Sequence, residues 1–137
     1  MIVADTSAMV ALLDRGARDH DTLRDAYELR PGEWILPWAI LPELDYVAAS
    51  RLGRGVAAAL REDLARGKFT IEWGRFADLQ RAEELNVSYR SLRLGLVDGV
   101  VMAVAERLRA RAIATVDVRD FGAVSLEGQP QLWPRDL

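Results

Sequence analysis

The sequence contains no cysteine, one histidine and one lysine. Without cysteine the chain forms neither disulfides nor thiolate metal sites, so Asp and Glu side chains are its main supply of metal ligands. A Ser-His-Asp or Cys-His mechanism would have to use His20, which stands in the polar stretch 18–21. We interpret this stretch as a solvated helix start and expect no catalytic or ligand role for His20.

Long hydrophobic runs are also missing. The longest, residues 34–41 and 94–105, are interrupted by Pro, Asp or Gly and are too short to span a bilayer. The first five residues lack the basic region and cleavage site of a signal peptide. With 137 residues and 50% hydrophobic content, we expect a single soluble domain over 1–137, located in the cytoplasm and without a membrane anchor.

The net charge of −3 argues against a broadly basic, nucleic-acid-binding surface. Of the 18 basic residues, all except Lys68 are arginine. Guanidinium groups suit phosphate, so a local arginine patch would still be able to bind RNA or DNA. A genome that prefers arginine codons explains the bias more simply.

Strand and helix patterns alternate along the chain. Short apolar runs predict strands at 1–5, 34–36, 69–73 and 112–116, with a fifth at 123–126 or near Leu132. Helical spacing predicts helices over roughly 8–13, 19–29, 41–52, 56–65, 75–89 and 96–109, and 117–122 is predicted as a turn. Right-handed crossovers then give an α/β fold, a three-layer α/β/α sandwich with a central parallel sheet of four to five strands.

Four acidic residues stand where a predicted strand ends or a predicted helix begins. Asp5 ends the first strand and Asp117 follows the fourth, while Glu43 and Asp98 stand in the first turns of helices. Each acid taken singly has a structural explanation as a cap or turn former. Their shared edge of the sheet is harder to explain by capping, because ligands of open parallel sheets bind beyond the carboxyl ends of the strands.

Carboxylates brought together repel one another, and a divalent cation relieves that repulsion. All-oxygen ligands without His or Cys suit Mg²⁺ or Mn²⁺. Such a pocket is best suited to metal-assisted hydrolysis of a phosphate ester. The hydroxyl side chains of Thr6, Ser7 and Thr115 stand beside the acids and are candidates for holding a water or orienting a carboxylate.

Four segments of the chain, residues 1–8, 42–44, 98–105 and 115–121, resemble in order the successive acidic motifs of PIN-domain ribonucleases. The likeness is closest to the VapC toxins of bacterial toxin–antitoxin pairs. It implies a parallel α/β/α sandwich, a homodimer, neutralisation by a VapB-type antitoxin, and Mg²⁺- or Mn²⁺-dependent endoribonuclease activity on structured or translation-related RNA. Carried over by position, the catalytic and metal-binding acids are Asp5, Glu43, Asp98 and Asp117. Asp120 stands where family members vary, so we expect it to be peripheral.

The arginines nearest the motifs, Arg90, Arg93 and Arg119, are the candidates for contacts with RNA phosphates. Tyr89 fits a surface loop better than a platform for a base. Trp38 and the helices spanning residues 48–60 are candidates for burial against a second copy or an antitoxin.

Three positions near the acidic motifs carry local expectations. Gly99 weakens the helix start beside Asp98, and Pro42 constrains how Glu43 enters the pocket. Asp45 points to another side of its helix and is expected to be solvated or paired. The alternative function is a catalytically weak PIN-fold module that binds RNA or protein, although the complete acidic set favours the enzyme.

Overall fold

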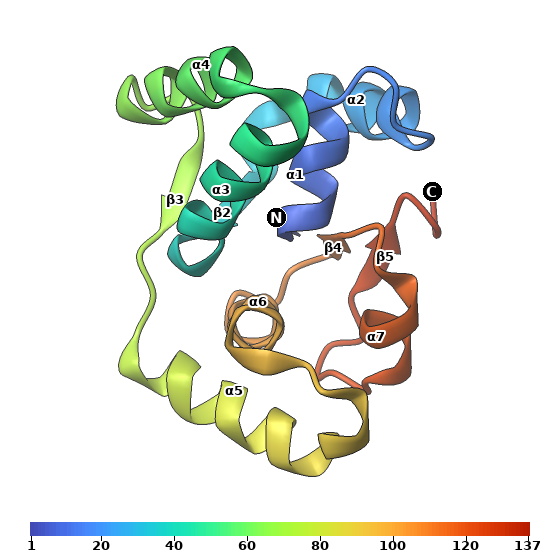
Figure 1. The fold of residues 1–137 in the computed structure, drawn as a ribbon. Helices are drawn as coiled ribbons and strands as arrows, with labels where there is room; N and C mark the ends of the chain where they lie inside the picture. The colour runs from blue at the N-terminus through green and yellow to red at the C-terminus, as the bar shows by residue number, and fades with distance from the viewer.

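The computed structural model describes all residues, 1–137, and contains a five-stranded parallel sheet (Figure 1). The strands are β1 (Ile2–Ala4), β2 (Trp34–Pro37), β3 (Thr70–Glu72), β4 (Ala112–Ala114) and β5 (Gln131–Trp133). They pair in the order β3-β2-β1-β4-β5, with Val3 of the central strand opposite Ile35 of β2 and Ile113 of β4. The predicted parallel sheet is confirmed, and its fifth strand is the one near Leu132.

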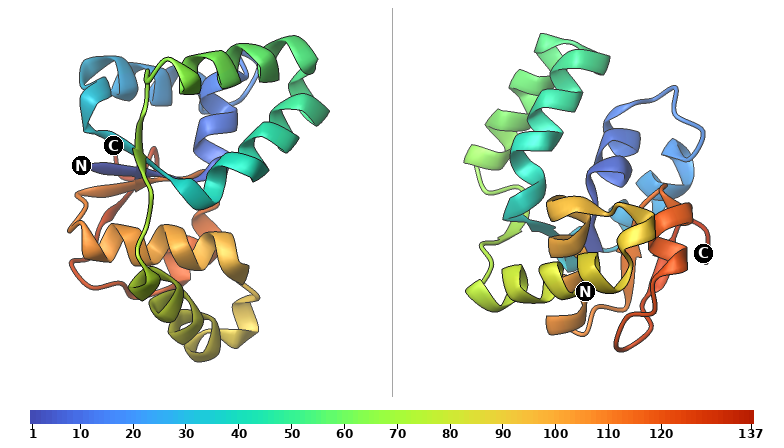
Figure 2. Two further views of the ribbon diagram at one scale, coloured as in Figure 1. Left: turned by 90° about the vertical axis from the view of Figure 1, so that its left-hand side faces the viewer. Right: turned by 60° about the horizontal axis from the view of Figure 1, so that its bottom comes forward.

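Helices cover both faces of the sheet. They are α1 (Thr6–Leu13), α2 (His20–Leu29), α3 (Leu41–Leu52), α4 (Arg54–Ala65), α5 (Phe76–Ser88), α6 (Gly95–Arg107) and α7 (Val118–Ala123). Three short 3-10 turns are η1 (Pro31–Glu33), η2 (Trp38–Ile40) and η3 (Arg90–Leu92). Helices α1 to α4 lie above the sheet and α5 to α7 below it in Figure 1, and the left view of Figure 2 shows the same layers edge-on. The three-layer α/β/α arrangement predicted from the sequence is confirmed.

The segment after β4 differs from the prediction. Residues 117–122 were expected to form a turn, but most of them belong to α7, because the Asp117 carboxylate accepts a hydrogen bond from the Asp120 N–H at 3.2 Å and caps the helix. Phe121 on this helix is buried, so the short helix is anchored to the core. Residues 123–126, one of the two candidates for the fifth strand, form no strand, since Ala123 ends α7 and the next three residues are irregular.

The environment of His20 also differs from the prediction. The side chain is buried rather than solvated, and its Nδ1 lies 2.9 Å from the carbonyl oxygen of Ala11. This contact joins the start of α2 to α1, so the imidazole has a structural partner. Asp45 is paired as expected, since Arg61 of α4 donates to its Oδ1 at 2.7 Å.

Helix α6 lies between the sheet and α5, and seven consecutive residues, Gly99 to Ala105, are buried. Helix α5 comes so close that a Cβ on Gly99 would lie 2.9 Å from Asn86 Nδ2 and 3.0 Å from Ala82 Cβ. The Asn86 amide also donates to the Gly95 carbonyl and accepts from the Gly95 N–H, both at 2.9 Å. Gly99 therefore has a packing role, and the first turn of α6, which carries Asp98, is held against α5.

None of the helices is both long enough and apolar enough to cross a membrane.

Candidate functional site

The strand order reverses between β1 and β4, because the chain builds outward from β1 through β2 to β3 and then returns to the other side of β1. In open α/β sheets, ligands bind beyond the carboxyl ends of the strands at this reversal. Asp5 directly follows β1, and Thr115 directly follows β4. The two central strands thus bring residues from distant parts of the sequence to one point.

Asp5 is the centre of a hydrogen-bond network that ties these strand ends together. Its Oδ2 accepts a hydrogen bond from the Ser7 hydroxyl at 2.8 Å and another from the Thr115 hydroxyl at 2.9 Å. In turn, Ser7 Oγ accepts from the Val116 N–H and Thr115 Oγ1 from the Asp117 N–H, both at 3.0 Å. Burial raises the pKa of Asp5, while the hydrogen bonds from Ser7 and Thr115 act in the opposite direction.

The side chain of Thr6 takes no part in this network. It is buried, and its Oγ1 has no hydrogen-bond partner. Of the three hydroxyl groups singled out in the sequence, only those of Ser7 and Thr115 donate to a carboxylate of the site.

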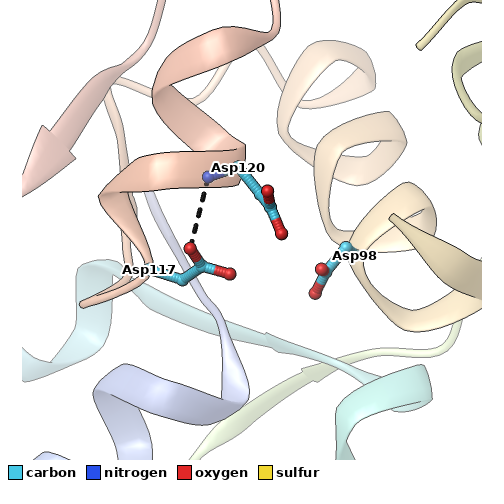
Figure 3. Close-up of side chains that lie close together, drawn as sticks. All are labelled: Asp98, Asp117 and Asp120. Atoms are coloured by element: carbon cyan, nitrogen blue, oxygen red, sulfur yellow. Dashed lines mark hydrogen bonds between the residues drawn. The ribbon is translucent and has the colours of Figure 1, made fainter. Parts of the chain in front are cut away.

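The most compact acidic group consists of Asp98, Asp117 and Asp120, each of which offers one carboxylate oxygen within 4.8 Å of the others (Figure 3). They come from the first turn of α6, from the N-cap of α7 and from α7 itself. Asp120 was expected to be peripheral, but α7 places it three residues beyond Asp117 and on the same side of the helix. The three-residue spacing predicts that Asp120 lies beside Asp117 only if residues 117–122 are helical, and the sequence analysis predicted a turn there.

The four acids predicted from the sequence all line one cavity of about 390 Å³. Asp5, Asp98 and Asp117 stand beside the sheet edge, and Glu43 enters from α3. Glu43 is outside the compact group of three.

The same cavity has two charged residues in its wall that the sequence interpretation missed, Asp14 and Arg51. Arg51 follows Glu43 by eight residues, with Val47 midway between them, so all three share one side of α3. This helical spacing is visible in the sequence and would have revealed Arg51.

Burial and repulsion both disfavour the ionised form of Asp98. Burial, as the larger cause, and the charges of Asp5, Asp117, Glu43 and Asp120 together raise the pKa of Asp98 to about 7. A carboxylate with such a pKa lacks a counter-charge. Because the nearby donors are all carboxylate oxygens, the arrangement fits a hard divalent cation such as Mg²⁺ or Mn²⁺.

Two of the three candidate RNA-binding arginines lie beside the acids. Arg93 and Arg119 line a second cavity of about 360 Å³, which they share with Asp120. Arg90 belongs to the adjacent turn η3 but lines neither cavity. Tyr89 is half-buried, and its hydroxyl accepts a hydrogen bond from the Ser125 N–H at 3.1 Å, so it has a packing role.

Trp38 and the helices spanning residues 48–60, the candidates for partner binding, differ in exposure. Ala48, Ala57 and Leu60 belong to the hydrophobic core, where they contribute to the packing of α3 and α4, so these side chains are not available to a partner. Trp38, in contrast, is 49% exposed.

The chain resembles known proteins over most of its length. A family model described as the PIN domain matches residues 2–125. Ribonuclease VapC26 of Mycobacterium tuberculosis is 28% identical over 123 residues, which cover 90% of this chain and 91% of that protein. Among solved structures, the sarcin–ricin loop cleaving toxin VapC20 of Mycobacterium tuberculosis has a TM-score of 0.79 at 21% identity, covering 93% of this chain and 98% of that one. DNA-bound VapBC from Salmonella typhimurium has a TM-score of 0.71 at 15% identity, covering 96% of this chain and 95% of that one.

Proposed function

Because this chain belongs to the PIN-domain family, we propose that it is a metal-dependent endoribonuclease that hydrolyses phosphodiester bonds in structured or translation-related RNA. The observation that carries the proposal is the compact group of Asp98, Asp117 and Asp120 at the point where the strand order reverses. The names of its relatives support it, since VapC26 is a ribonuclease and VapC20 cleaves the sarcin–ricin loop. From an RNA substrate of this kind we infer that the protein acts in the cytoplasm.

In this proposal Asp98, Asp117 and Asp120 would hold Mg²⁺ or Mn²⁺, with Asp5 and Glu43 completing the acidic wall. Such a cation would supply a water of lowered pKa and a positive charge for the leaving oxygen of a phosphodiester. Ser7 and Thr115 orient Asp5, because both hydroxyls donate to its Oδ2 and leave Oδ1 without a side-chain hydrogen bond.

The proposal is tested by incubating the purified protein with ribosomal RNA and sequencing the newly formed 5′ ends. We expect cleavage in Mg²⁺ or Mn²⁺ and none in EDTA. Asp98→Asn should lower the cleavage rate by about 100-fold or more, the size of loss that follows removal of one electrostatic group from an active site. The matched control is Asp45→Asn, because Asp45 pairs with Arg61 away from the acids and should not affect the rate. Cleavage that persists in EDTA would contradict the proposal, and tight RNA binding without any products would favour the non-catalytic module instead.

We also propose that a VapB-type antitoxin neutralises this chain. Support comes from the VapBC complex among its structural neighbours and from the acidic cavity, which suits a basic side chain of a partner. We expect a short reading frame beside this gene. Its product, added in equimolar amount, should abolish RNA cleavage by this protein. Full cleavage in the presence of that product would argue against it.

A further inference from the structure

The two cavities described above meet at the acidic group. Asp98 and Asp117 line the larger cavity, and Asp120 lines the smaller one. Since the three carboxylates lie within 4.8 Å of one another, the group forms the boundary between the two cavities. Figure 3 shows Asp120 on α7, on the far side of the group from the faint blue helix α1, whose residues belong to the larger cavity.

Each cavity has in its wall at least one arginine without an ion-pair partner. Arg51 in the larger cavity and Arg93 and Arg119 in the smaller one form no salt bridge and no side-chain hydrogen bond within the chain. This differs from Arg81 and Arg107, each of which binds two carboxylates. Even the carboxylate of Asp120, in the wall of the same cavity, forms no ion pair with Arg93 or Arg119.

The backbone at Arg93 is left-handed, with φ 54° and ψ 49°, because this residue is the C-cap that ends the turn η3. Arg93 thus follows the turn at the wall of the smaller cavity.

We propose that Arg93 and Arg119 form a subsite for a phosphate of the RNA strand next to the phosphate that is cleaved, and that Arg51 contacts the strand on the other side of the acidic group. A strand carries a phosphate at every nucleotide, so a phosphate held at the acids brings its neighbours into the two adjoining cavities. Guanidinium groups bind phosphate oxygens through paired hydrogen bonds. The smaller cavity, about 360 Å³, has room for a phosphate with its hydration, since a water occupies about 30 Å³.

This subsite rests on the proposed ribonuclease function, and its test measures binding separately from cleavage. In an Asp98→Asn background with Mg²⁺ present, the affinity for a short labelled single-stranded RNA is measured by fluorescence anisotropy at several salt concentrations. We expect Arg93→Gln and Arg119→Gln each to raise Kd about tenfold and to reduce the salt dependence by about one phosphate contact. Arg51→Gln should also weaken binding.

The matched control is Arg109→Gln. Arg109 is likewise exposed, unpaired and left-handed, with φ 50°, but it lies just before β4 and therefore at the opposite edge of the sheet. Its replacement should leave Kd unchanged, and thermal unfolding should show that the four single variants and the Arg93→Gln/Arg119→Gln double variant are folded. An unchanged Kd in the Arg93→Gln/Arg119→Gln double variant would overturn the subsite, as would equal weakening by Arg109→Gln.

Two further outcomes separate the subsite from its premise. If the wild type cleaves RNA and the double variant binds it equally well, the ribonuclease function stands and the subsite is wrong. If the wild type cleaves no RNA but Arg93 and Arg119 still determine its affinity, the subsite stands and the nuclease proposal is wrong. A polyglutamate peptide that displaces the RNA at equal charge concentration would show that the cavity binds carboxylates and would also overturn the RNA assignment.

Discussion

At the scale of single residues, Asp98 and Asp5 line the same cavity but have different environments. Asp5 is buried, but two hydroxyl groups donate to it and stabilise its ionised form. Asp98 has no side-chain hydrogen bond, and burial and the neighbouring carboxylates both disfavour its ionised form. The negative charge of Asp98 is unfavourable in the chain alone, and a bound cation would stabilise it.

The raised pKa of Asp98 predicts how the stability of the metal-free protein depends on pH. The pKa is about 7 in the folded chain against 3.8 for a free carboxyl, so the folded state holds more protons between these values. Stability in EDTA should therefore be highest at the acidic end of this window and fall as pH rises towards 7. With solvent screening of the half-buried group taken into account, the loss is about 1–2 kcal/mol, or roughly 3–8 °C in Tm.

The measurement is thermal unfolding in EDTA at pH 5 and pH 7.5. Asp98→Asn should remove most of the difference, and Mg²⁺ should raise Tm mainly at the higher pH. Glu72, Asp78 and Glu106, whose pKa values are lowered by arginine partners or hydrogen bonds, lose their contribution only at lower pH. The same fall in Tm in Asp98→Asn as in the wild type would show that another group is responsible.

At the scale of elements, helix α6 positions Asp98 because it is packed on two sides. Its inner side packs on the sheet, and its outer side packs on α5 through Gly99. Arg107 near its end donates to Asp78 of α5 at 2.8 Å and to Glu72 of β3 at 2.7 Å. The position of Asp98 thus depends on contacts along the whole helix.

Gly99→Ala should destabilise the protein by about 1–3 kcal/mol, the cost of overpacking a filled core. The new methyl group would overlap Asn86 and Ala82, so α5 or α6 must shift. Urea unfolding measures the change. Gly55→Ala is the matched control, because Gly55 lies in helix α4 with no heavy atom near its Cβ position, and the substitution there should be neutral or slightly stabilising. Equal stability of Gly99→Ala and wild type would mean that α5 moves without cost.

At the scale of the whole molecule, one face exposes large apolar side chains around a groove of about 570 Å³. They are Trp38, Trp73, Phe76, Leu79 and Leu96. The ring centroids of Trp38 and Trp73 lie 4.7 Å apart, which joins η2 to the segment after β3. This side, where β3 leads into α5, faces the viewer in the left view of Figure 2. Apolar surface of this kind is typical of an interaction site, and because the resemblance to VapC toxins implies a homodimer, we propose that a second copy of the chain packs here.

Trp73→Ser should therefore weaken self-association at least tenfold, since exposed tryptophans at interfaces often contribute 2 kcal/mol or more. Sedimentation velocity over a range of protein concentrations measures the change. Leu29→Ser serves as control, because Leu29 is 78% exposed at the end of α2 and outside the groove. A wild type that remains monomeric throughout the range would refute the expected homodimer.

The sequence by itself determined the order and type of most elements, because apolar residues recur with the periods of strands and helices. It also located Asp5 and Asp117 beyond the carboxyl ends of two central strands, and both line the same cavity in the structure. Helix α7 and the burial of His20 were missed, because the burial of Phe121 in the core and the contact of the imidazole with the carbonyl of Ala11 depend on how the elements pack.

Only the tertiary structure decided which charged side chains meet. Asp120 of α7 comes close to Asp98 in the first turn of α6, and Arg93 meets Arg119 in a cavity between η3 and α7. Local sequence encodes backbone periodicity, whereas the separation of two side chains from distant elements depends on how those elements pack. For this reason the four acids and their shared edge of the sheet were recognisable in the sequence, but the inclusion of Asp120 and the cavity that Arg93 and Arg119 share with it were not.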